Sequence, residues 1–147
     1  MSTKDNEAIV ARTLEGFNAR DYGQTSGLLG DLIDMPSGNR ISGPAGLEQY
    51  WKGWIGAFPD GKVEITKNVG AEDGTVVTEF RARGTNNGPM MMGGQQLPAT
   101  GRPVDVMFCQ VSTVRDDKIV DARLYYDGMT FATQLGLMPQ ATGSAAG

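Results

Sequence analysis

The 147-residue chain has a formal net charge of -4, with 39% hydrophobic and 20% charged residues, and it contains no histidine. These values predict one soluble folded domain and exclude the basic stripe of a nucleic-acid-binding surface. The lack of histidine excludes Ser-His and Cys-His catalytic pairs and imidazole metal sites. Acid-base chemistry would therefore need carboxylates, tyrosine, lysine or water.

The single cysteine, Cys109, excludes an internal disulfide and a zinc site built on a cysteine pair. Its expected role is that of a small buried hydrophobic residue. No stretch approaches the roughly 20 apolar residues of a membrane span, and the first residues lack the apolar core of a signal peptide. We therefore expect a cytoplasmic protein with one domain over residues 1–140 and a flexible tail over 141–147.

Helical periodicity dominates the first part of the chain. Apolar side chains recur with i, i+4, i+7 spacing between Val10 and Phe17, which predicts a helix over about residues 5–19. A short helix is expected near residues 25–30. Residues 32–35, Leu-Ile-Asp-Met, then read as a short extended segment that is ended by a proline.

The clearest helix pattern begins at Pro44, because proline at the first helical position loses no hydrogen bond. Apolar and aromatic side chains follow at i, i+3, i+4, i+7, i+8 and i+11, and Pro59 ends the pattern. Such a stripe indicates either core packing or the wall of a pocket, and both remain open. Its members are Leu47, Tyr50, Trp51, Trp54, Ile55 and Phe58.

From Lys62 onward, apolar and polar residues alternate with a period of two, which predicts successive antiparallel hairpins. Helices that precede a meander of strands favour an α+β fold with a large antiparallel sheet. The second face of the longest strand is also largely apolar, so we expect a homodimer through the sheet. The predicted strands span residues 63–69, 76–83, 104–114 and 118–126, with a last helical turn at 129–135.

The segment of residues 86–101 is rich in glycine and proline and is expected to have no regular structure. It contains three consecutive methionines, Met90–Met92, and methionine adapts to irregular apolar surfaces. We interpret this segment as a flexible apolar flap that could close a pocket mouth. The alternative is an ordinary hairpin loop packed on the core.

Six short motifs occur in order between residues 58 and 139: Phe58-Pro59-Asp60, Gly84-Thr85-Asn86-Asn87-Gly88-Pro89, Thr100-Gly101-Arg102-Pro103-Val104, Asp117-Lys118-Ile119-Val120, Tyr125-Tyr126-Asp127 and Gln134-Leu135-Gly136-Leu137-Met138-Pro139. Together they resemble the SnoaL-like polyketide cyclase family, within the nuclear transport factor 2-like superfamily that includes ketosteroid isomerase. The resemblance implies a curved antiparallel sheet wrapped by the N-terminal helices into a cone-shaped pocket. It also implies a dimer and a ring closure that uses no metal and no cofactor.

The resemblance also implies roles for particular residues. The family's catalytic aspartate on the last strand corresponds to Leu124, which cannot exchange a proton. A family histidine corresponds to Asn86, and an acidic or histidine position on the long strand corresponds to Gln110, which can still donate a hydrogen bond to an oxyanion. Asp34 lies where the superfamily often has a functional Asp or Asn, and its apolar sequence neighbours disfavour the charged carboxylate.

We therefore predict a cofactor-free cyclase or isomerase of polyketide antibiotic biosynthesis, with Asp34 as general base assisted by Gln110 or Asn86. The alternative role for Asp34 is that of a turn residue. The alternative functions are a component of polyketide hydroxylation and a small-molecule-binding protein without catalysis. The expected partner is an apolar, aromatic polyketide-like ligand rather than nucleic acid or a membrane. The expected ligand contacts are Phe17, Tyr50, Trp51, Trp54, Phe58, Met91, Phe108, Leu124 and Tyr126.

Overall fold

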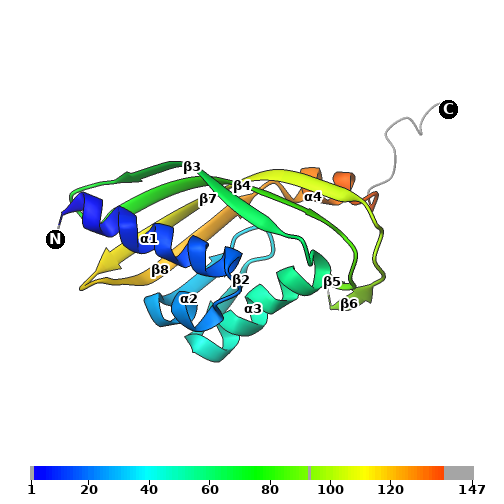
Figure 1. Ribbon diagram of the computed structural model, residues 1–147, viewed down its shortest axis with the longest axis horizontal. Coiled ribbons are helices and arrows are strands. Elements are labelled where there is room, and N and C mark those ends of the chain that lie inside the picture. The colour runs from blue at the N-terminus through cyan, green and yellow to red at the C-terminus, as the bar shows by residue number, and fades with distance from the viewer. Residues whose placement is uncertain (1, 93, 138–147) are drawn as a thin grey trace.

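A curved sheet forms one layer of the protein, and helices α1, α2 and α3 lie on one of its faces (Figure 1). The structure is a computed structural model that describes residues 2–92 and 94–137. The helices are α1 (Thr3–Asn18), α2 (Tyr22–Leu28), α3 (Gly43–Ala57) and α4 (Gly128–Gln134). Within the described residues, none of them is long and apolar enough to cross a membrane. The predicted tail, residues 141–147, lies outside the described residues.

The main sheet has six strands in the order β2-β1-β8-β7-β4-β3. A second, small sheet pairs β5 with β6. The strands are β1 (Leu29–Asp34), β2 (Asn39–Ser42), β3 (Lys62–Gly70), β4 (Thr75–Thr85), β5 (Met90–Met92), β6 (Gln95–Leu97), β7 (Pro103–Arg115) and β8 (Lys118–Tyr126). The predicted α+β class and the meander from β3 to β8 are confirmed.

One pair of strands departs from the expected antiparallel arrangement. The register of β1 with β8 is parallel, whereas the other pairs in the main sheet are antiparallel. A hairpin can join only antiparallel neighbours, but β1 and β8 are joined through most of the chain, so no tight turn constrains their direction. The main sheet is therefore mixed.

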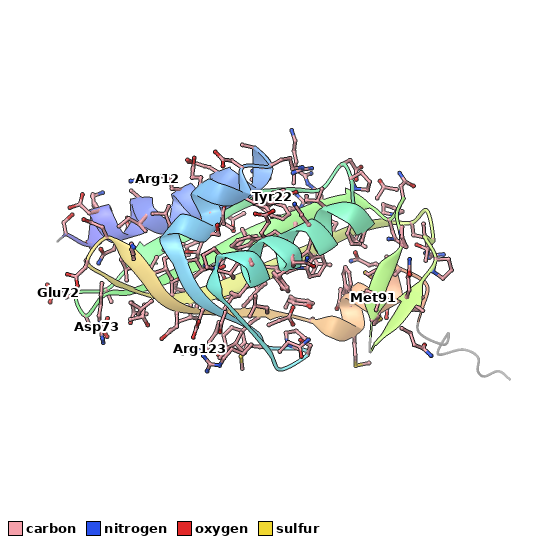
Figure 2. All side chains as sticks on the ribbon, turned by 90° about the horizontal axis from the view of Figure 1, so that it is seen from below. Arg12, Tyr22, Glu72, Asp73, Met91 and Arg123 are labelled. Atoms are coloured by element: carbon pink, nitrogen blue, oxygen red, sulfur yellow. The ribbon has the colours of Figure 1, made fainter. Side chains whose placement is uncertain are left out.

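The glycine-rich segment also differs from its prediction. Residues 86–101 were expected to lack regular structure, but Met90–Met92 pairs in antiparallel register with Gln95–Leu97. The hairpin packs beside α3. This tertiary contact stabilises the hairpin, and the composition of the segment does not indicate it. Met91 lies on this hairpin at the end of the molecule opposite Glu72 and Asp73 (Figure 2).

The sequence analysis also predicted one short element near the N-terminus at the wrong position and missed another. The helix α2 begins at Tyr22, earlier than expected, because the Asp21 side chain accepts a hydrogen bond from the backbone N–H of Gln24 and caps it. The strand β2 was missed because it is a short, largely exposed edge strand without apolar alternation. Its pairing with β1 leads the chain directly into α3.

The core lies between the helices and the inner face of the sheet. On β7, alternate side chains from Val104 to Gln110 are buried, while Met107 on the opposite face is 49% exposed. The N-terminal helix buries Ile9, Val10 and Leu14 against the sheet side of the molecule. This alternation determines which side chains can reach a ligand, because only the inner face adjoins the helices.

Candidate functional site

A cavity lies between α3 and the inner face of the sheet, with a volume of about 90 Å³. Its helical wall is the aromatic stripe of α3, from Tyr50 to Phe58. Its sheet wall includes Phe108, Gln110 and Leu124 from the two central strands. The stripe is therefore both part of the core and a cavity wall, so both interpretations of its pattern are correct.

Aromatic rings stack in a row across the sheet at one side of this cavity. Phe80 and Phe108 stack with their centroids 5.3 Å apart, and Phe108 and Tyr126 stack at 4.6 Å. They align because they are register partners on β4, β7 and β8. Trp54 from α3 meets Phe108 and Tyr126 edge-on, at 6.1 and 6.0 Å. Such walls favour flat, apolar ligands.

The carboxylate of Asp34 is buried at the end of β1, with only 4% of the residue exposed. It accepts hydrogen bonds from the Tyr50 hydroxyl at 2.7 Å and from the Tyr126 hydroxyl at 3.1 and 3.2 Å. The Ser37 hydroxyl and backbone N–H also donate to it, at 3.1 and 3.2 Å. These donors compensate for the loss of water around a buried carboxylate. Asp34 itself is not part of the cavity lining.

Both tyrosine hydroxyls on Asp34 hold their protons firmly. Burial, followed by the negative charge of Asp34, raises the pKa of Tyr50 well above its ordinary value. The same two causes, in the same order, raise the pKa of Tyr126. A phenol that stays protonated remains a hydrogen-bond donor, so both can act as donors over the whole physiological pH range. Only Tyr50 of the pair also lines the cavity.

Gln110 is buried, lines the cavity and donates from Nε2 to the Ser112 hydroxyl at 3.0 Å. It has no further hydrogen-bond partner among the described residues, so one amide N–H remains for a ligand oxygen. Thr78, Gln110, Leu124 and Asp34 follow one another as register partners across β4, β7, β8 and β1. Gln110 thus lies in the same row of the sheet as Asp34.

Asn86 is buried and is not part of the cavity lining. Its Nδ2 donates to the carbonyl oxygens of Ala57 and Gly88, at 3.1 and 3.0 Å. Its Oδ1 accepts from the backbone N–H and the hydroxyl of Thr100, at 2.8 and 3.0 Å. The amide is fully used in holding the base of the β5-β6 segment against the end of α3. Asn86 thus lies outside the cavity lining, in which its predicted role would have placed it.

Seven of the nine expected ligand contacts lie in the cavity wall, while Met91 and Tyr126 do not. Met91 is 65% exposed on the β5-β6 hairpin, and Tyr126 is directed to Asp34. Sequence reasoning missed Phe80 and Phe131. The alternation of β4 could have indicated Phe80, but no local pattern indicates Phe131. The expected contacts in the wall are Phe17, Tyr50, Trp51, Trp54, Phe58, Phe108 and Leu124.

Two exposed cations mark one side of the cavity. Lys62 and Arg83 line both the cavity and a shallow groove on the surface, and they are register partners on β3 and β4. Val104 is shared in the same way. The cavity and the surface groove therefore adjoin each other along β3, β4 and β7. Within the described residues, no group of three or more His, Cys, Asp or Glu side chains could hold a metal ion.

Comparisons with known proteins agree with this architecture. The family model described as SnoaL-like polyketide cyclase matches residues 9–135. IdmH from Streptomyces antibioticus, described as "a putative polyketide cyclase", is 26% identical with a TM-score of 0.73, over 89% of this chain and 98% of IdmH. AclR from Streptomyces galilaeus, described as "a putative hydroxylase", is 20% identical with a TM-score of 0.78, over 95% of this chain and 86% of AclR.

A third solved structure, from Catenulispora acidiphila DSM 44928, is described as having a ketosteroid isomerase-like protein fold. It is 20% identical with a TM-score of 0.72, over 88% of this chain and 93% of that chain. No match was found among curated proteins. The family match spans most of the chain, and these likenesses support the fold of the whole domain.

Proposed function

Since the chain belongs to the SnoaL-like polyketide cyclase family, we propose that it is a cofactor-free acid-base enzyme acting on an apolar, aromatic, polyketide-like molecule. One observation carries the proposal. The buried carboxylate of Asp34 accepts a hydrogen bond from Tyr50, and Tyr50 lines an aromatic cavity. A titratable group beside an apolar cavity is the arrangement from which acid-base sites are built.

The position of Asp34 offers a replacement for the aspartate that the family resemblance expects on β8. That position is Leu124, whose register partner on the neighbouring strand β1 is Asp34. The carboxylate is thus displaced by one strand, at the same level of the sheet. A strand spacing is roughly 4.8 Å, which is within the reach of a proton transfer that uses one intervening hydroxyl.

The proposed reaction begins with an enolisation. A C–H bond next to a ligand carbonyl breaks, its electron pair moves to the carbonyl oxygen, and Asp34 is the final acceptor of the proton. The free N–H of Gln110 stabilises the developing oxyanion. In a cyclase, the enolate carbon then forms a C–C bond with a second carbonyl of the same molecule, and the resulting alkoxide recovers the proton. In an isomerase, the proton returns to another carbon. Neither route consumes a co-reactant.

The cavity limits the ligand's shape. Its volume of about 90 Å³ is below the roughly 300–1,000 Å³ of pockets that enclose drug-sized molecules. A multi-ring ligand therefore enters with one end first, or the rim side chains move when it binds. The ring that reaches Tyr50 and Gln110 is the one expected to react.

A direct test uses 2-tetralone, a bicyclic aromatic ketone with exchangeable C–H bonds. The protein is incubated with it in deuterated buffer, and the incorporation of deuterium is followed by NMR. We expect exchange above the buffer rate, and a loss of roughly 100-fold or more for Asp34→Asn. The matched control is Asp127→Asn, which removes an exposed helix-capping carboxylate and should retain the exchange rate. A wild-type rate equal to that of buffer would contradict the proposal.

A second candidate is a binding protein without catalysis. It is supported by the fact that the Asp34 carboxylate does not line the cavity and already has donors on both oxygens. This candidate predicts that 2-tetralone binds but exchanges no faster than in buffer. A role in hydroxylation, as in the description of AclR, would instead appear as incorporation of labelled molecular oxygen into a product.

A further inference from the structure

Tyr50 is the link between the cavity and the buried carboxylate. Its side chain lines the cavity, while its hydroxyl donates to Asp34 Oδ2 at 2.7 Å. Asp34 does not line the cavity, and the inner-face position beside it on β8 is occupied by Leu124. Of the described side chains that donate to Asp34, Tyr50 is therefore the one that also reaches the cavity.

The remaining donors on Asp34 fix it in place without reaching the ligand. Tyr126 donates at 3.1 and 3.2 Å, and Ser37 donates through its hydroxyl and backbone N–H, yet neither residue lines the cavity. The two tyrosines share an acceptor but differ in their access to the cavity. The matched control for Tyr50 is Tyr125, which is 39% exposed and makes no hydrogen bond to Asp34 among the described residues.

We propose that Tyr50 is the catalytic residue that touches the ligand, and that it relays a proton between the ligand and Asp34. The inference rests on the proposed acid-base function and assigns a role within the same site. Asp34 is then a positioning residue and proton store that acts through Tyr50.

The relay balances without any further reactant. The ligand C–H bond breaks and its proton bonds to Tyr50 Oη, while the Tyr50 O–H bond breaks and that proton bonds to Asp34 Oδ2. The electron pair of the C–H bond moves to the ligand carbonyl oxygen. Tyr50 is a neutral phenol before and after the step, Asp34 becomes a neutral acid, and the ligand becomes an enolate. The reverse step returns a proton to the ligand.

Moving both protons together avoids a free tyrosinate. Burial and the charge of Asp34 raise the pKa of Tyr50, so an anionic phenolate is costly at this position. The concerted exchange transfers the negative charge from Asp34 to the ligand oxygen, where the free N–H of Gln110 is available.

The first experiment compares deuterium exchange of 2-tetralone by Tyr50→Phe, Tyr125→Phe and Asp34→Asn. We expect Tyr50→Phe to lose roughly as much activity as Asp34→Asn, about 100-fold, and Tyr125→Phe to stay within about fivefold of wild type. The double variant Tyr50→Phe/Asp34→Asn should be no slower than either single variant, since members of one relay act as a unit. Loss in Asp34→Asn with full activity in Tyr50→Phe would overturn the relay and leave the acid-base function intact.

The second experiment does not depend on turnover. The probe 1-naphthol carries a hydroxyl on the carbon that corresponds to C1 of 2-tetralone, from which the proton leaves, and naphthalene lacks the hydroxyl. We expect Tyr50→Phe to weaken 1-naphthol binding about tenfold with naphthalene binding unchanged, whereas Tyr125→Phe, at an exposed position, alters neither. An unchanged ratio of the two affinities in Tyr50→Phe would overturn the contact, even if the wild-type protein proves inactive on 2-tetralone.

A third measurement uses the unmodified protein, in case Tyr50→Phe does not fold. With tyrosine labelled at the ring carbon that bears the hydroxyl, 1-naphthol should shift the Tyr50 NMR signal, and naphthalene should leave it nearly unchanged. The Tyr126 signal, assigned through Tyr126→Phe, is the internal control. Equal shifts of both signals with both probes would contradict direct contact between Tyr50 and the ligand.

Discussion

Asp34 on β1 and Leu124 on β8 are register partners in the single parallel pair of the main sheet as described. Partners in a sheet have side chains on the same face, so both are directed toward the helices. Leu124 lines the cavity, whereas Asp34 lies beside it under the tyrosine hydroxyls. A leucine thus occupies the cavity wall, and the carboxylate lies one strand away.

A carboxylate placed at position 124 should partly replace the carboxylate of Asp34 in the exchange reaction. Asp34→Asn should abolish exchange of 2-tetralone, and adding Leu124→Asp should restore part of it, because the new carboxylate faces the cavity. Leu124→Asp alone should lower the free energy of unfolding by about 2–4 kcal/mol, since it replaces a buried leucine beside a second carboxylate. Asp34→Asn/Leu124→Asn is the control, and restoration by it as well would argue against a proton-transfer role.

The tyrosines on Asp34 should resist alkaline titration. The pKa values of Tyr50 and Tyr126 are raised in the folded protein, whereas an unfolded tyrosine ionises near about pH 10. The folded state therefore keeps protons that the unfolded state releases, so this contribution to stability is full below about pH 10 and falls above it. Absorbance at alkaline pH measures ionised tyrosine. Tyr50→Phe and Tyr126→Phe should each reduce the absorbance change that accompanies alkaline unfolding. Neither should alter the absorbance change near pH 10, which comes from the other tyrosines.

Asn86 should matter for stability and not for the ligand. Asn86→Ala removes four hydrogen bonds from a buried site and leaves several backbone groups unpaired, which should cost about 2–4 kcal/mol of unfolding free energy. Urea unfolding measures this loss. The neighbouring, exposed Asn87→Ala is the matched control and should stay within about 0.5 kcal/mol of wild type. The hydroxyl of 2-naphthol corresponds to the oxygen of the 2-tetralone enol, and affinity for this probe should be the same in all three proteins. A selective loss of affinity in Asn86→Ala would show that Asn86 contacts the ligand.

The homodimer through the sheet remains a prediction, and the outer face of the sheet suggests where to test it. Met107, Val77 and Tyr125 on this face are 49%, 39% and 39% exposed. Met107→Glu places a charge in the middle of the expected interface, so a dimer should dissociate to a monomer in sedimentation velocity. Met129→Glu, at an exposed position on α4, should leave the assembly unchanged. A monomeric wild-type protein would refute the prediction directly.

Local sequence determined much of this protein. Periodicity alone located α3 and placed its aromatic side chains on one face, because a helix brings residues three and four apart together. Alternation placed Phe108 and Gln110 on one face of their strand, because side chains of a strand alternate between its faces. The family resemblance implied that this face and Leu124 line the pocket. The absence of histidine restricted any proton transfer to the other titratable groups.

The neighbours of Asp34 were decided only by the tertiary structure. Tyr50 is 16 positions from Asp34 and Tyr126 is 92 positions away, and both reach the same carboxylate. A local pattern indicates which face a side chain occupies, but it carries no information on which strand lies alongside. The parallel pairing of β1 with β8 brought Asp34 beside Leu124, and the position of α3 over β1 placed Tyr50 between the carboxylate and the cavity.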